Sequence, residues 1–277
     1  MEAWLRSLVV CTSLALMTGG AGGIQVVEEP GLQVVENGTV DHVVLDCPFV
    51  LEAEDNIGLV IKWFHLNNPI AVYQWISGRH APQATGILEG RLDLQFEVSE
   101  DALQRHRALK ILRPTTELAG LYTCSISSFA DEKLYTQRLL VYSEPRDVKV
   151  WTEEQDDDHV TVLCQVDHVF PQPLLRLRQR SAGNDSVALS AVKEVNSWSR
   201  GSYNLTVEAT VRDDDLDGPT VFECLVTIPD TEVQVLSDTE YHPRVRPVAG
   251  EVKTGGGGGN SAVSVMAGLA LLLLWRV

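Results

Sequence analysis

Gly120-Leu121-Tyr122-Thr123-Cys124 is the stretch of this sequence that decides its fold. A second cysteine, Cys47, lies far upstream of it, and Trp63 stands between the two cysteines, closer to Cys47. Within the stretch, Tyr122 and Cys124 are two positions apart, so they point to the same face of a strand while the residues between them point to the other face. Two cysteines with a buried tryptophan between them are typical of a β-sandwich.

Short strands are predicted on both sides of this stretch, over residues 24–142. Apolar residues recur there with a period of two, and turn residues separate the runs. The closely spaced middle segments favour a sandwich with additional strands. The predicted strands cover residues 32–36, 42–47, 60–66, 70–76, 84–88, 91–98, 108–112, 120–127 and 134–142.

A second set of strands is predicted over residues 146–240, after the linker Ser143-Glu144-Pro145-Arg146. Cys164 and Cys224 each lie in a run in which every second residue is apolar, so each faces the interior. No tryptophan matches Trp63, and either Leu175 or Leu177 is expected to fill that space. Phe222 stands two residues before its cysteine, where the first set has a tyrosine. Trp151 and Trp198 are interpreted as packing residues.

The amino-terminal segment, residues 1–23, is predicted to be a secretory signal peptide. It combines Arg6 with an apolar run and a series of small residues. Its removal would take away Cys11 and leave four cysteines. An even number of cysteines suits disulfides formed in an oxidising compartment.

The carboxyl-terminal segment is predicted to carry a lipid-anchor signal. Residues 241–261 combine prolines with a run of glycines and are interpreted as a stalk and spacer, and residues 262–277 form a hydrophobic tail. The apolar run is shorter than the roughly 20 residues of a membrane helix. We therefore expect a glycosylphosphatidylinositol signal with attachment between Gly255 and Asn260. A short, tilted membrane span is the alternative.

The charge and the motifs argue against several classes of function. A net charge of −16 disfavours nucleic acid and anionic lipid as partners, because both require a basic surface. No serine or cysteine nucleophile occurs in a recognisable motif, so we expect no enzyme and no cofactor. The acidic runs Asp156-Asp157-Asp158 and Asp213-Asp214-Asp215 lack the spacing of a calcium loop, so they are interpreted as solvated turns and no metal site is expected.

Three sequences match the acceptor pattern for N-linked glycans, and the predicted secretion provides the context that this modification needs. Asn204 is the best placed, because Leu205 beside it should face the core and turn the asparagine toward solvent. The predicted glycosylation sites are Asn37, Asn184 and Asn204.

These residues together resemble the immunoglobulin superfamily. The resemblance implies an all-β chain of two tandem immunoglobulin-like sandwiches, a variable-type domain over residues 24–142 and a constant-type domain over residues 146–240. It implies disulfides Cys47–Cys124 and Cys164–Cys224, the pairing of three possible ones that keeps each bridge inside one sandwich. Trp63 and Tyr122 would belong to the core.

One position departs from the usual variable-type pattern. Leu118 stands where an acidic residue normally pairs with an arginine, here Arg91. Glu117 is the candidate substitute for that acidic residue.

More narrowly, the first domain is similar to the beaten-path-like proteins of the arthropod nervous system. The similarity rests on Ile61-Lys62-Trp63-Phe64, on the stretch ending at Cys124, and on Phe170-Pro171-Gln172-Pro173-Leu174. It implies a membrane-anchored or secreted protein that binds another immunoglobulin-type receptor in axon guidance or synaptic pairing.

A cell-surface recognition or adhesion protein is therefore the leading hypothesis, and binding to a second copy of the chain stays open. The alternatives are a soluble immune-type protein that binds a pathogen or blocks a receptor, and a passive matrix component. Because Trp63 faces the core, its neighbours in the strand face outward. Which of Tyr73, Gln74 and Trp75 on the next strand points outward stays open, because a bulge could shift the register of that strand. The predicted partner-binding residues are Phe64, Leu66, Tyr73, Trp75 and Phe129.

Overall fold

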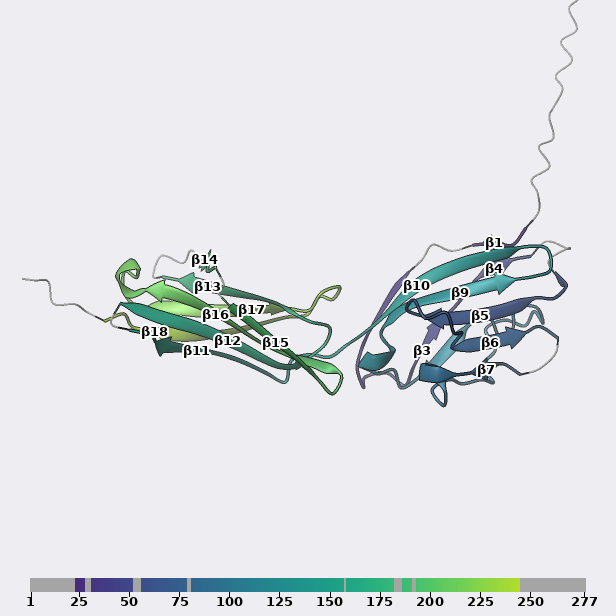
Figure 1. Cartoon of the computed structure of the whole chain (residues 1–277), viewed down its shortest axis with the longest axis horizontal. Coiled ribbons are helices and arrows are strands. Elements are labelled where there is room, and N and C mark those ends of the chain that lie inside the picture. The colour runs from purple at the N-terminus through teal and green to yellow at the C-terminus, as the bar shows by residue number, and fades with distance from the viewer. Residues whose placement is uncertain are drawn as a thin grey trace, which may run out of the picture. The chain divides into compact units, whose positions relative to one another are not determined.

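The computed structural model of the chain describes residues 23–27, 31–51, 56–78, 81–156, 158–181, 186–190 and 193–244. In these ranges the regular structure consists of strands and short 3-10 helices (Figure 1). The strands form two sandwiches, each of which is described by itself below. The predicted signal peptide, except for Gly23, and the glycine-rich spacer and hydrophobic tail lie outside the described residues.

One large sheet dominates the first sandwich. β10 pairs with β2 in parallel, and all the other neighbours in the sheet are antiparallel. β6 and β7 are the additional strands expected of a variable-type domain. The order of the six strands is β2 (Leu32–Glu36), β10 (Glu132–Tyr142), β9 (Gly120–Ser127), β5 (Val60–His65), β6 (Tyr73–Ile76) and β7 (Gln83–Ala84).

The opposite layer consists of two short pairs of strands. β3 (His42–Leu45) pairs with β8 (Leu109–Leu112), and β1 (Gln25–Val26) pairs with β4 (Phe49–Val50). The disulfide Cys47–Cys124 joins this layer to the large sheet, as expected. The inward side chains of both layers form one continuous apolar core.

The predicted strand over residues 91–98 is wrong. Only Leu92 makes a bridge, to Ile111, and turns follow it. The side chain of Asp93 accepts a bond from the backbone N–H group of Gln95, which gives this segment a local alternative to a strand ladder.

The predicted strand over residues 84–88 is also largely wrong. β7 ends at Ala84, and the 3-10 helix η2 (Gly86–Leu88) follows. Gly86 has a φ of +59°, outside the range of a strand, so the extended conformation stops there. Residues 70–76 form a strand only from Tyr73 onward.

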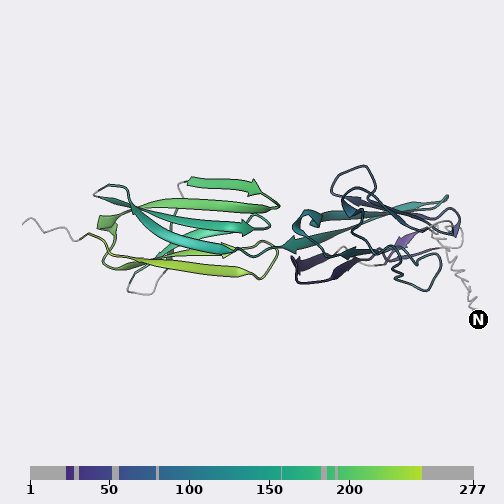
Figure 2. The ribbon, with the colours of Figure 1, turned by 90° about the horizontal axis from the view of Figure 1, so that it is seen from below.

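The second sandwich contains two four-stranded sheets, seen from a second direction in Figure 2. The disulfide Cys164–Cys224 joins them, as expected. One sheet has the order β11 (Asp147–Glu154), β12 (His159–Val169), β16 (Ser202–Arg212), β15 (Lys193–Ser199); the other has the order β14 (Ser186–Ala188), β13 (Leu174–Arg180), β17 (Thr220–Thr227), β18 (Gln234–Tyr241). Tyr241, which we assigned to the stalk, belongs to β18.

Leu177 fills the position opposite Cys224 in this core and is buried, whereas Leu175 is only partly buried. Phe222 is fully buried beside it. The interpretation of Trp198 as a packing residue holds only in part, because 55% of its side chain is exposed. β15 lies at the edge of its sheet, so one side of the indole has no neighbouring strand.

Candidate recognition face of the first sandwich

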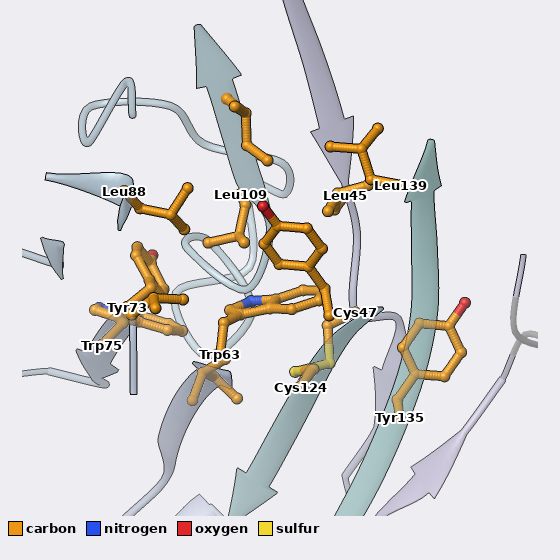
Figure 3. Close-up of a cluster of buried hydrophobic side chains, with 14 of the residues drawn as sticks. Leu45, Cys47, Trp63, Tyr73, Trp75, Leu88, Leu109, Cys124, Tyr135 and Leu139 are labelled. Atoms are coloured by element: carbon orange, nitrogen blue, oxygen red, sulfur yellow. A yellow bond between two sulfur atoms is a disulfide. The ribbon is translucent and has the colours of Figure 1, made fainter. Parts of the chain in front are cut away.

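The buried pair Trp63 and Cys124 determines which side chains of the large sheet point outward. The two residues lie opposite each other in the β5–β9 register, and neither is accessible to solvent. The indole lies beside the disulfide in Figure 3. Because side chains alternate along a strand, the neighbours of Trp63 point to the other side of the sheet.

We call this outward surface the front face. The registers of β5 with β6 and β9, and of β9 with β10, place its side chains in three cross-strand rows. These rows are Glu132, Ser127, Val60 and Ile76; then Leu134, Ser125, Lys62 and Gln74; then Thr136, Thr123 and Phe64.

A shallow concavity of about 430 Å³ lies on the front face. Its wall includes the half-buried Phe64 and the more exposed Leu66 and Leu134, which are 54% and 64% exposed. Lys62 and Glu132 add one charge of each sign to the wall. The rest of the wall is polar and uncharged: Asn67, Asn68, Thr123, Ser125 and Ser127. The concavity therefore mixes apolar side chains with polar and charged groups, as protein interfaces do.

Hydrogen bonds hold the polar residues of the front face in position. The Ser125 hydroxyl donates to Oε1 of Glu132 at 2.8 Å, and the hydroxyls of Thr123 and Thr136 are 3.1 Å apart. Leu66 lies just beyond β5, in the turn, with a φ of +56°, and its N–H donates to the carbonyl of Leu121. This bond fixes the backbone of Leu66 against β9.

The expectation that Tyr73 and Trp75 lie on the front face is wrong. Both are buried in the core, and Gln74 between them faces outward. Their register with β5 runs without a shift, so no bulge turns them over. The Tyr73 hydroxyl donates to the carbonyl of His106 at 2.6 Å, and the Trp75 ring meets the His106 ring edge-on. Burial raises the pKa of Tyr73.

Phe129 lies in the turn between β9 and β10 and is 84% exposed. Its N–H donates to the carbonyl of Ile57, and its ring covers Gly58, where an added Cβ would stand 2.7 Å from a ring carbon. The Ser128 hydroxyl accepts bonds from the N–H groups of Ala130 and Asp131, which tightens the turn. Phe129 is therefore an exposed aromatic side chain on a hydrogen-bonded turn.

Leu134 is an exposed residue of this surface that was missing from the prediction. The alternation of β10, in which Leu134 and Thr136 flank the inward Tyr135, was the signal that could have identified Leu134.

Hydrogen bonds from aromatic side chains to backbone carbonyls support the core behind the front face. The Trp63 indole Nε1 donates to the carbonyl of Arg107 at 2.9 Å, and the Tyr122 hydroxyl donates to the carbonyl of Leu118 at 2.8 Å. Burial raises the pKa of Tyr122. The proposed substitute pair is present, because Arg91 contacts Glu117 at 2.7 Å.

His65 is a buried histidine beside this core. Its Nε2 donates to the carbonyl of Ala119 at 3.1 Å, and its ring packs on Tyr122. Desolvation lowers the pKa of His65, and the bond to Ala119 opposes that effect in part. Burial thus favours the neutral form of the imidazole.

The predicted glycosylation sites have different surroundings. Asn37 lies in the exposed turn after β2, and Asn184 lies outside the described residues. Asn204 is half-buried in β16, and its Oδ1 accepts a bond from the N–H of His168 at 2.9 Å. The amide nitrogen of Asn204, to which a glycan would attach, takes no part in this bond.

The described ranges show neither a metal site nor a membrane helix. No group of three or more His, Cys, Asp or Glu side chains in them is arranged to hold a metal ion. No helix in the same ranges is long and apolar enough to cross a membrane.

Comparison with known proteins adds evidence on the fold. No family model matches the chain. Hemicentin-1 of Mus musculus is 31% identical over 145 residues, which cover 50% of this chain and 2% of that protein. The chain therefore spans about 2% of the length of this curated relative.

Two solved structures are similar over most of the described chain. Bovine butyrophilin has a TM-score of 0.57 and 14% identity, covering 80% of this chain and 98% of that one. A chain in the crystal structure of ICOS in complex with ICOS-L and an anti-ICOS-L VNAR domain has a TM-score of 0.54 and 13% identity, covering 76% and 99%. The chain therefore folds as two tandem immunoglobulin-like sandwiches, each with its own disulfide.

Proposed function

We propose that this chain is a cell-surface recognition or adhesion protein whose first sandwich binds another immunoglobulin-type protein through the front face. The observation that carries the proposal is the concavity on that face, with exposed Leu66 and Leu134 and half-buried Phe64 around Lys62. Exposed apolar groups gathered on one rigid sheet, with few charges, are characteristic of protein interaction sites.

Two further observations support an extracellular protein partner. The two disulfides suit an oxidising environment. The similar solved structure of ICOS with ICOS-L is, by its title, a complex between proteins, and the chain matched in it shares the fold of this chain. The similarity to beaten-path-like proteins adds the finer proposal of a role in axon guidance or synaptic pairing.

Attachment to the membrane and glycosylation complete the proposal, and both rest on the sequence. A lipid anchor added between Gly255 and Asn260 would hold the protein on the cell surface, and glycans would be attached at Asn37, Asn184 and Asn204. Release from cells by a phosphatidylinositol-specific phospholipase tests the anchor. Recovery of the full chain only from the medium would favour the soluble immune-type alternative.

The front face is tested by a binding screen of the full chain, displayed on cells, against immunoglobulin-type ectodomains. With a partner in hand, Phe64→Asp and Leu134→Asp should each weaken binding by about 2 kcal/mol, as for an interface hot spot. The matched control is Leu236→Asp, because Leu236 is exposed to a similar degree on the second sandwich. Unchanged binding by both front-face variants, at normal surface levels, would contradict the proposal.

A further inference from the structure

The edge strand β15 of the second sandwich exposes an unused row of backbone groups. β15 stands at the end of the order β11-β12-β16-β15 (Figure 1), and all seven of its residues are exposed. An exposed edge of this kind is a template for one more strand.

The turn between β15 and β16 determines which backbone groups point outward. Arg200 and Gly201 both have positive φ, +51° and +79°, as in a two-residue hairpin turn, and Ser199 pairs with Ser202 across it. In such a hairpin the pair that flanks the turn is hydrogen-bonded, and hydrogen-bonded pairs alternate along the strand. The N–H and C=O groups of Glu194, Asn196 and Trp198 therefore point away from β16.

The side chains of the same three residues share one side of the sheet. They lie opposite Val207, Leu205 and Tyr203 of β16. The Trp198 ring packs against two other aromatic rings: its centroid lies 4.6 Å from that of Tyr203 and 5.9 Å from that of Phe170. More than half of the indole is nevertheless exposed.

We propose that β15 pairs with β15 of a second copy of this chain, antiparallel, about a two-fold axis through Asn196. In this register Asn196 faces Asn196 of the other copy, and Glu194 faces Trp198 on each side. All three residues with outward backbone groups then form hydrogen-bonded pairs with their counterparts. The two sheets join into one continuous sheet. This inference goes beyond the proposed function, because it uses the second sandwich and leaves the front face free.

A second copy fits this edge because the strand is complementary to itself. The register sets the Glu194 carboxylate, an acceptor, against the Trp198 indole, whose N–H is a donor. Asn196 carries both donors and acceptors and pairs with itself. Lys193 faces Ser199, and its charge already meets Glu208 of β16 at 3.3 Å, so no like charges stand opposite each other.

A cysteine-trapping experiment on the full chain in secreting cells tests the pairing. Each cysteine among the described residues is in a disulfide, so an added thiol is distinctive there. Asn196→Cys should produce a covalent dimer, with a doubled mass on a non-reducing gel that returns to the monomer on reduction. Leu236→Cys, at an exposed site in β18, is the matched control and should stay monomeric.

The register is tested by co-expression. Glu194→Cys and Trp198→Cys should crosslink with each other and far less when either is expressed alone. Without added cysteines, Asn196→Pro should abolish association in sedimentation, because it removes an outward N–H, whereas Asn196→Ala should retain it. Monomeric Asn196→Cys, or crosslinking equal to that of the Leu236→Cys control, would overturn the proposal.

Discussion

Each of the two sandwiches has one disulfide between its layers, but different side chains pack beside it. In the first, Trp63 lies opposite Cys124, and in the second, Leu177 lies opposite Cys224. The next inward pair is His65 with Tyr122 in the first sandwich. In the second it is Gln179 with Phe222.

The two sandwiches differ at these positions because the first contains more irregular backbone than the second. The first sandwich has short strands in its second layer and an irregular segment before β8, and the side chains of Trp63 and Tyr73 hold that segment by bonding to the carbonyls of Arg107 and His106. The second has strands of eleven residues in β12 and β16, which satisfy their own backbone. In the first sandwich, two aromatic residues with polar tips therefore tie irregular backbone to the core.

Removing either disulfide should have the largest effect on the free energy of unfolding. Cys47→Ala with Cys124→Ala, or Cys164→Ala with Cys224→Ala, should each lower the free energy of unfolding by about 4 kcal/mol, because separations of 77 and 60 residues close loops of similar entropy. Urea unfolding followed by tryptophan fluorescence measures both. A loss confined to one sandwich would show that the two bridges differ in more than loop length.

Exchanging Trp63 and Leu177, the residues opposite the two disulfide cysteines, should have the next largest effect on stability. Trp63→Leu should cost about 3 kcal/mol or more, because it leaves a cavity and leaves the Arg107 carbonyl without its donor. The reverse change, Leu177→Trp, overpacks its core and should cost about 1–3 kcal/mol. Tolerance of both changes in the same unfolding assay would mean that the two cores are interchangeable.

Gln179 and His65 hold equivalent positions, each two residues after the residue opposite the disulfide cysteine, and their replacement should change stability in opposite directions. Oε1 of Gln179 is buried and has no hydrogen-bond partner among the described residues, so Gln179→Leu should leave stability unchanged or raise it by about 1 kcal/mol. His65→Leu removes the donor to Ala119 and should cost about 1 kcal/mol. Equal losses in thermal unfolding would contradict this contrast.

The pH dependence of the first sandwich should be the smallest effect. Because burial lowers the pKa of His65, the unfolded chain binds the proton more tightly than the folded one. The stability that this residue contributes is complete above its unfolded value of about 6.5 and is lost as the pH falls toward the folded value. Thermal unfolding at pH 7.5 and 5.5 should show this loss, and His65→Gln should reduce it; an unchanged loss would assign it to other groups.

The sequence predicted the inward face of each long strand and the two disulfides. Trp63, Cys124 and Tyr122 are all buried, and alternation alone places Phe64 on the outer side. Phe64, Leu66 and Phe129 remain predicted partner-binding residues. These features were readable because a period of two relates neighbours within one strand, whatever the rest of the chain does.

Only the tertiary structure decided which strands exist at the margins and where they lie. Tyr73 and Trp75 are inward because β6 pairs with β5 in one register, and residues 91–98 are not a strand because turns follow the single bridge from Leu92 to Ile111. Trp198 is exposed because β15 has a neighbour on one side. Sequence alternation sets relative faces, but the register and the edges of a sheet depend on partners far along the chain.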